Sequence, residues 1–230
     1  AQSAEEDKMK ALLILIAGLL AVTAQAQTTF EHFTLEDQWV PLVAPDGTPL
    51  PNFISPGEFY CTGGGEPDPT VPIGCVGGGG IHIRDLQGVS CVTEPVMHDW
   101  RVEGMAWWSL AANWDADKTG PVSAIWRIVP GDCIDMALVM DPEGYWDDVY
   151  TYWEGTATGM RIMVPDEDAP LGVKWISTIK YVGQGMGDLA GQKMMAVETI
   201  TTYFPSPGPG EFVGITDPEG IVDVTIKTKY

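Results

Sequence analysis

The sequence predicts an all-β fold: a single closed antiparallel β-barrel of about eight strands, preceded by an irregular arm rich in glycine and proline. Three observations predict it. Apolar residues recur at every second position in the segments after residue 81, turn-forming clusters separate these segments, and no segment after residue 26 shows the 3.6-residue period of a helix. With 230 residues and 45% hydrophobic content, the chain can bury a substantial core.

The charge balance excludes one class of partner. The chain has 12 Lys and Arg against 32 Asp and Glu, a formal net charge of -20, and no local basic patch. Such a chain repels nucleic acid and anionic lipid surfaces. We therefore expect no nucleic-acid partner, and no membrane association after the N-terminal leader has been removed.

The N-terminus has the pattern of a secretory signal. Lys8 and Lys10 precede an apolar run over residues 11–22, and the small residues around Gln25 end at Ala26. The run is shorter than the roughly 20 residues that span a bilayer. Residues 1–26 are therefore expected to be upstream residues and a signal peptide, with Met9 as the start, and the mature chain to be secreted or periplasmic. A buried N-terminal helix is the alternative.

Four cysteines in an exported chain favour disulfides. Of the three possible pairings we favour Cys61 with Cys75, which closes a Gly/Pro-rich loop, and Cys91 with Cys133. A metal site has weaker support because the sequence has no Cys-x-x-Cys spacing and its three histidines are not spaced as ligands with the thiols. We expect neither a metal nor a cofactor.

Residues 27–80 are predicted to form the irregular arm. Turn signals such as Pro45-Asp46-Gly47 and the glycine run over residues 77–80 interrupt it, and long periodic runs are absent. We expect one or two short strands there, held to the body by a disulfide.

Residues 81–230 are predicted to form the barrel. The clearest alternation lies in residues 98–115, where Trp100, Trp108 and Trp114 share one face with small residues between them, as in the filled interior of a small barrel. Turn clusters such as Asp-Pro-Glu-Gly separate the remaining strand candidates. These are residues 122–129, 150–164, 173–182, 193–204 and 221–227.

Three glycine-spaced stretches within residues 100–204 resemble a known superfamily. They are GPVSAIW at 120–126, YWEGTATG at 152–159 and YVGQGMGDLAGQKM at 181–194. The last is similar to a strand-turn-strand segment of allene oxide cyclase-like and dirigent-like proteins. The resemblance implies an eight-stranded, lipocalin-resembling antiparallel barrel with an apolar central cavity, and carries over no catalytic residue.

Two carboxylates are weak catalytic candidates. Glu103 and Glu198 each alternate with apolar residues, so either side chain could point into a dry cavity, where a raised pKa would suit acid or base catalysis. The alternative is that they belong to the solvated face, as most acids of such a chain do. His98 and Asp99 are adjacent and point to opposite faces of a strand, which disfavours a hydrolase triad.

Tryptophan is abundant, with nine residues. Its large apolar surface and single N–H suit a core, and they also suit a cavity that holds a hydrophobic ligand. Filling of the core alone is the alternative. The candidates for ligand binding are Trp100, Trp108, Trp114 and Trp126.

The leading interpretation is a non-enzymatic binding or interaction module whose Trp/Met-lined interior takes a small hydrophobic ligand. An isomerase or cyclase using the same pocket is one alternative, and a structural protein that assembles through strand edges, as a homo-oligomer, is another. A cavity with a buried carboxylate favours the enzyme, a cavity without one favours the carrier, and a packed interior with a bare edge favours assembly.

Overall fold

The computed structural model describes residues 28–39, 53–55, 57–67, 75–76, 79–131, 149–169, 171–202 and 219–229. Within these ranges the chain forms twelve β-strands and one 3-10 turn, Gly187–Leu189, and no α-helix. The all-β prediction is confirmed. No helix in this part of the chain is both long and apolar enough to cross a bilayer. The predicted signal peptide, residues 1–26, lies outside the described residues.

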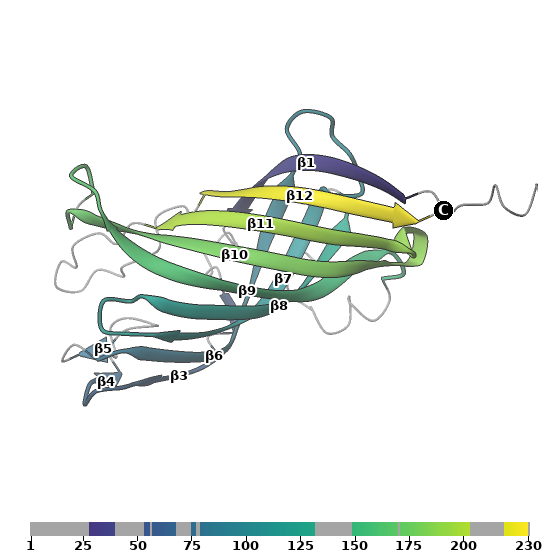
Figure 1. Cartoon of the computed structure of the whole chain (residues 1–230). Coiled ribbons are helices and arrows are strands. Elements are labelled where there is room, and N and C mark those ends of the chain that lie inside the picture. The colour runs from purple at the N-terminus through teal and green to yellow at the C-terminus, as the bar shows by residue number, and fades with distance from the viewer. Residues whose placement is uncertain are drawn as a thin grey trace, which may run out of the picture.

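Eight strands pair in a ring, and every pairing is antiparallel. Its order is β1, β12, β11, β10, β9, β8, β7 and β6, and a second pairing of β1 with β6 joins the two ends (Figure 1). The strands are β1 (Thr28–Trp39), β6 (Ile81–Thr93), β7 (Gly104–Trp114), β8 (Gly120–Pro130), β9 (Tyr152–Pro165), β10 (Val173–Met186), β11 (Gln192–Thr202) and β12 (Glu219–Lys229). Five of them lie within three or four residues of the predicted bounds at each end.

Strand β1 corrects the prediction of an arm over residues 27–80. It is a 12-residue strand that pairs with β12 along nearly its whole length and then with the end of β6. Its inward positions include the carboxylates Glu31 and Asp37 beside Phe33 and Leu35, so the apolar alternation that reveals a half-buried strand is broken.

The rest of the predicted arm covers the exposed edge of β6. Strands β2 (Phe53–Ser55) and β3 (Glu58–Cys61) pair with the first half of β6, which β1 does not reach (Figure 1). Beyond them, β4 (Glu66–Pro67) and β5 (Cys75–Val76) form a small separate ladder. Added strands of this kind remove the open backbone groups that a bare edge would present.

One predicted disulfide is confirmed. Cys61 and Cys75 are bonded, with their Cα atoms 5.8 Å apart, and so tie β3 to β5. Cys91 on β6 is also disulfide-bonded, while its predicted partner Cys133 lies outside the described residues.

The alternation predicted for residues 98–115 begins later than expected. Strand β7 starts at Gly104, and residues 94–103 form a turn-rich loop between β6 and β7. Trp100 lies in this loop and is 54% exposed, so the prediction that it faces the interior is wrong. From Ala106 to Ala112 the even-numbered residues face inward, as the period of two requires.

The buried residues line the inside of the ring. They come from all eight strands and include Leu35, Ile83, Trp126, Trp153 and Ile226. The ring therefore encloses a single apolar interior, and the polar side chains inside it stand out.

Candidate functional site

A cavity of about 90 Å³ lies inside the ring. On the scale of about 10–15 Å³ for one water molecule, it has room for several waters or a small organic molecule. Its wall is mainly apolar and includes Leu35, Trp108, Trp126 and Met194. Four polar side chains interrupt the wall: Asp37, Ser90, Tyr181 and Glu198.

Two of the polar side chains form a buried carboxyl pair, which we call the acid pair: Asp37 of β1 and Glu198 of β11. Glu198 is 2% exposed, and the Asp37 carboxyl is buried although the residue as a whole is only half-buried. Strand β12 runs between the two strands and places Gly220 opposite Asp37. A Cβ atom at Gly220 would lie 2.5 Å from Glu198 Oε1 and 3.3 Å from Asp37 Cβ, so a larger residue there would force the Glu198 carboxyl to move.

Two hydroxyl groups extend the acid pair. The Tyr181 hydroxyl donates a short hydrogen bond to Glu198 Oε2, and Ser90, which is buried, lies beside Asp37. Burial and the negative charge of Glu198 hold the pKa of Tyr181 well above its usual range, so this hydroxyl keeps its proton. It is therefore a fixed donor to the acid pair.

Both carboxyls of the acid pair favour the protonated form over the ionised form. Burial, and next the charge of Asp37, raise the pKa of Glu198 well above its usual range. Burial also raises the pKa of Asp37, opposed in part by its hydrogen bonding to Glu198 and Ser90. Two neighbouring carboxyls in a buried, mainly apolar site cannot both ionise without a large free-energy cost, which favours one proton held between them.

Several buried polar atoms around the cavity complete no hydrogen bond within the described residues. They are Asp37 Oδ1, Glu198 Oε1, Ser90 Oγ and Trp126 Nε1. A buried polar atom without a partner costs about 1–3 kcal/mol, so native proteins keep few of them and place many of these at binding sites. Asp37, Glu198 and Ser90 lie close to one another, and a proton shared by the acid pair joins their oxygens, which leaves the Trp126 N–H to hydrogen-bond with a molecule in the cavity.

Glycines determine where the cavity tryptophans lie. The ring of Trp126 reaches from β8 across β9 to β10, where a Cβ atom at Gly183 or Gly155 would lie 2.5 or 2.9 Å from Trp126 Cζ2. Its ring also meets that of Tyr181 edge-on, with centroids 5.9 Å apart. The glycine-spaced stretches noted in the sequence thus create space for an indole beside the acid pair.

The structure brings only some of the predicted site residues together. Trp108, Trp126 and Glu198 line the cavity. Trp114 lies away from it at the far end of β7, where the Arg161 guanidinium stacks 4.5 Å from its ring centroid. Glu103 is also outside the cavity, in the loop of residues 94–103, where its carboxylate accepts a hydrogen bond from the Glu94 backbone N–H and contacts His98.

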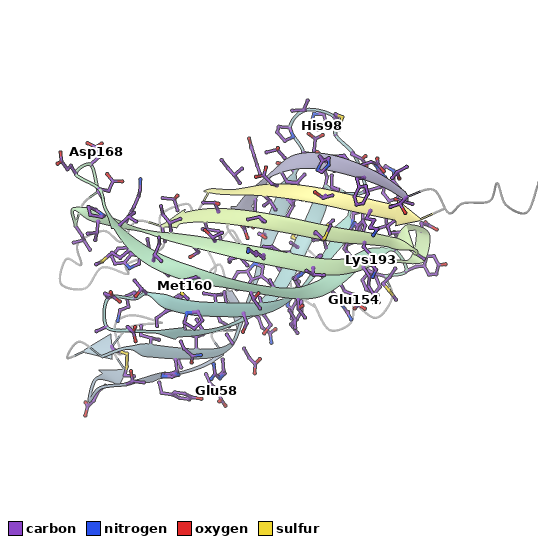
Figure 2. The ribbon with its side chains drawn as sticks, viewed as in Figure 1. Glu58, His98, Glu154, Met160, Asp168 and Lys193 are labelled. Atoms are coloured by element: carbon purple, nitrogen blue, oxygen red, sulfur yellow. A yellow bond between two sulfur atoms is a disulfide. The ribbon has the colours of Figure 1, made fainter. Side chains whose placement is uncertain are left out.

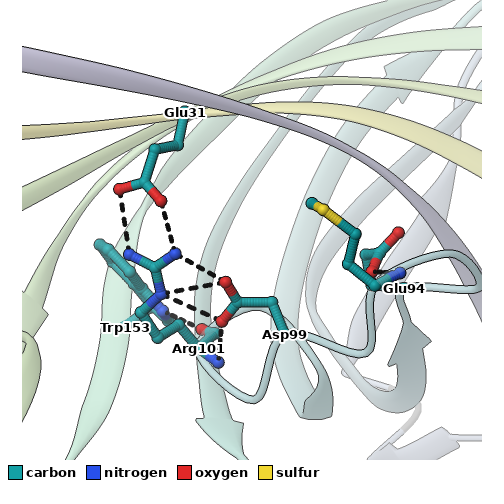
Figure 3. A network of polar contacts seen from close by, with 6 residues as sticks. Glu31, Glu94, Asp99, Arg101 and Trp153 are labelled. Atoms are coloured by element: carbon teal, nitrogen blue, oxygen red, sulfur yellow. Dashed lines mark hydrogen bonds and ion pairs between the residues drawn. The ribbon is translucent and has the colours of Figure 1, made fainter.

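Residues 94–103, which we call the end loop, lie over one end of the ring (Figure 3). Arg101 forms ion pairs with Glu31 of β1 at 2.7 Å and with Asp99 at 2.6 Å. The buried Trp153 donates a hydrogen bond from Nε1 to the Arg101 carbonyl at 2.6 Å. The fully buried Val102 completes the contact, so the end loop closes this end of the interior.

Sequence reasoning missed Asp37, Ser90 and Tyr181. Asp37 lies in the segment predicted to be irregular, so no strand alternation pointed it inward. Tyr181 and Glu198 do share a signal: each is on the inward parity of its predicted strand, and the antiparallel register of β10 and β11 brings them close together.

Comparisons with family models, curated proteins and solved structures find no match to the chain. The resemblance to allene oxide cyclase-like and dirigent-like barrels therefore stays a prediction.

Proposed function

We propose that the ring is a closed barrel whose interior cavity binds a small, mostly apolar molecule with one polar group, and that the protein acts outside the cytoplasm. The observation that carries this proposal is a mainly apolar cavity whose wall contains the polar side chains Asp37, Ser90, Tyr181 and Glu198 together with Trp126, whose buried N–H has no partner within the described residues. An apolar wall with a few convergent polar groups is the usual form of a small-molecule site. The Cys61–Cys75 disulfide supports export.

The polar group of the ligand is a carbonyl or hydroxyl oxygen. Such an oxygen accepts hydrogen bonds, and the cavity offers it the Trp126 N–H and the proton shared by Asp37 and Glu198. A carboxylate ligand would place a further negative charge beside the acid pair, which the dry interior disfavours.

Cyclohexanone is a suitable probe because it is small and apolar apart from its carbonyl group. We expect it to raise the melting temperature in proportion to the logarithm of its concentration, as binding to the native state requires. Ala124→Phe, which fills the cavity wall, should abolish the rise, and Ser123→Phe, on the outer face of the same strand, should keep it. An absent rise in the unsubstituted protein, together with a ligand-free native mass spectrum of the exported chain, would overturn the proposal.

A second candidate function is proton transfer on the bound molecule, and the acid pair favours it. In this scheme one carboxylate removes a proton from the carbon beside the ligand carbonyl. The C–H electron pair forms the enol C=C bond, and the carbonyl π pair takes the carboxylic acid proton of the second carboxyl onto oxygen. The enol then returns its O–H proton to that carboxylate, and the first carboxyl returns its proton to carbon, on the other face or at a conjugated position, so the net reaction is an isomerisation without an oxidant. A cavity that contains a buried carboxylate meets the criterion stated above for an enzyme rather than a carrier.

Deuterium exchange tests this second function without knowledge of the substrate. In D₂O, the protein should speed the uptake of deuterium at the carbons beside the carbonyl of cyclohexanone, followed by NMR. Glu198→Gln should abolish the acceleration, while the exposed Glu58→Gln should leave it intact. Binding without any acceleration would identify a carrier.

Assembly through strand edges depends on the edges that the ring leaves open. The eight strands close a ring, although β1 pairs with β6 only over residues 36–39, so within the described residues one edge of residues 28–35 and the outer edges of β2 and β3 pair with no strand. Edge assembly therefore stays an alternative, and the outer faces of the ring are a second surface on which copies could meet.

A further inference from the structure

The outer face of β8 to β12 carries a patch with few charges, which we call the neutral face. Outward residues lie in register across these five strands in rows, of which one is Ile125, Thr156, Val182, Met195 and Thr225. The apolar residues of the patch, among them Met160, Val182, Val197 and Ile221, are between 40% and 59% exposed. Most of the other members are threonine.

The neutral face contrasts with the rest of the chain. One row further along the strands, the outward residues Arg127, Glu154, Lys193 and Lys227 are charged (Figure 2). In a chain with net charge -20, only two charged side chains on a five-strand surface are fewer than expected if that surface contacts nothing but solvent.

The two charges are Lys180 on β10 and Asp223 on β12, and they lie symmetrically. Val197 of β11 is in register with both, so it lies midway between them. A two-fold axis along β11 at Val197 would place Lys180 of each copy over Asp223 of the other. Isologous contacts of this kind are the commonest in homo-oligomers.

We propose that the neutral face is the contact surface for a second copy of this chain, arranged about that axis. The charge distribution selects a second copy as the occupant, because the neutral face has no net charge and its own two charges, Lys180 and Asp223, pair across the axis.

The extent of the neutral face predicts a reversible dimer. The patch has three rows, so four strand spacings of about 4.8 Å and two row spacings of about 6.8 Å give roughly 260 Å² for each copy. A stable interface needs about 800 Å² for each partner. We therefore expect monomer and dimer to exchange, with a proportion that depends on concentration.

Sedimentation velocity of the mature chain over a concentration series tests the proposal. Lys180→Asp alone and Asp223→Lys alone should each weaken dimerisation by about tenfold or more, because each creates two like-charge contacts. An equimolar mixture of the two variants should restore it, since every contact in the mixed dimer again joins opposite charges. Val197→Glu should abolish it.

The mixing experiment separates contact between copies from damage to the fold, because a misfolded variant cannot be rescued by another. Lys193→Asp, which changes the same charge on the same face of β11 outside the patch, is the matched control and should dimerise normally. A monomer at all concentrations, or a mixture no tighter than the single variants, would overturn the proposal.

Discussion

At the level of single residues, the acid pair carries a desolvation penalty that an apolar interior would avoid. A lone ionised carboxylate in an apolar medium is strongly disfavoured, so an acid persists there only when protonated or paired. Asp37 and Glu198 meet this demand by sharing a proton and by the hydroxyl groups of Tyr181 and Ser90. Leucine or valine would suit an interior built only for stability, so the presence of the acid pair supports the proposed binding function and the proposed proton transfer.

The acid pair predicts a pH dependence of stability. Because the pKa of Glu198 is raised in the folded state from an ordinary value of 4.5, its contribution is complete below about that pH and is lost as pH rises through the raised pKa. Glu198→Gln stays neutral, so the variant should match the parent at low pH and become the more stable of the two as pH rises. Melting temperatures across a pH series measure this.

Exposed Glu58→Gln is the control and should melt in parallel with the parent at every pH. The double variant Asp37→Asn/Glu198→Gln should flatten the curve further, because the pKa of Asp37 is also raised. Parallel curves for Glu198→Gln and the parent would show that the carboxyl is not held in a dry interior.

The close packing of Gly220 against the Glu198 carboxyl can be tested by substitution. Gly220→Ala places a methyl group 2.5 Å from Glu198 Oε1, an overpacking that should cost about 1–3 kcal/mol. In the background of Glu198→Ala the same substitution should cost much less, since the clashing oxygen is gone. Chemical denaturation of the parent, the two single variants and the double variant gives the coupling free energy between the two positions. If the two losses of stability simply add, the Glu198 carboxyl does not lie against Gly220.

At the scale of elements, the strands of the body were predictable and their exceptions have physical causes. Alternation with period two located β8 to β12 because their inward positions are mostly apolar or glycine. It failed for β1, whose inward Glu31 and Asp37 serve the end loop and the acid pair. It also failed at Trp100, since a loop can mimic two or three positions of a strand. Polar residues with interior roles therefore obscure the pattern that would reveal them.

The end loop yields a prediction of its own. Arg101→Met keeps most of the side-chain volume and removes both ion pairs, so it should destabilise the protein by about 1–3 kcal/mol near neutral pH. Arg101 lowers the pKa of Asp99 and Glu31, so the stability it adds is present above their ordinary pKa values and is lost as pH falls through the lowered ones. The gap between parent and variant should therefore close in acid.

Denaturation of both proteins at neutral and acidic pH measures that gap. Arg127→Met, which breaks the half-exposed pair with Glu154 at 3.3 Å, is the matched control and should cost under about 1 kcal/mol. A gap of constant size at both pH values would mean that Arg101 acts through packing alone.

At the scale of the whole molecule, the net charge of -20 opposes the compact state through self-repulsion. Raising NaCl from 10 to 150 mM shortens the screening length from about 30 Å to about 8 Å and so weakens this repulsion. The melting temperature should therefore rise, by about 2 °C or more for each kcal/mol gained in the free energy of unfolding. Salt also weakens exposed ion pairs, which lowers stability.

Arg101→Met separates these two effects of salt because it lacks the ion pairs of Arg101. Both the parent and Arg101→Met should gain stability with salt, the variant at least as much as the parent. Calorimetry at a protein concentration below that of dimer formation measures this. A melting temperature that falls with salt in both proteins would show that local ion pairs outweigh the repulsion from the net charge.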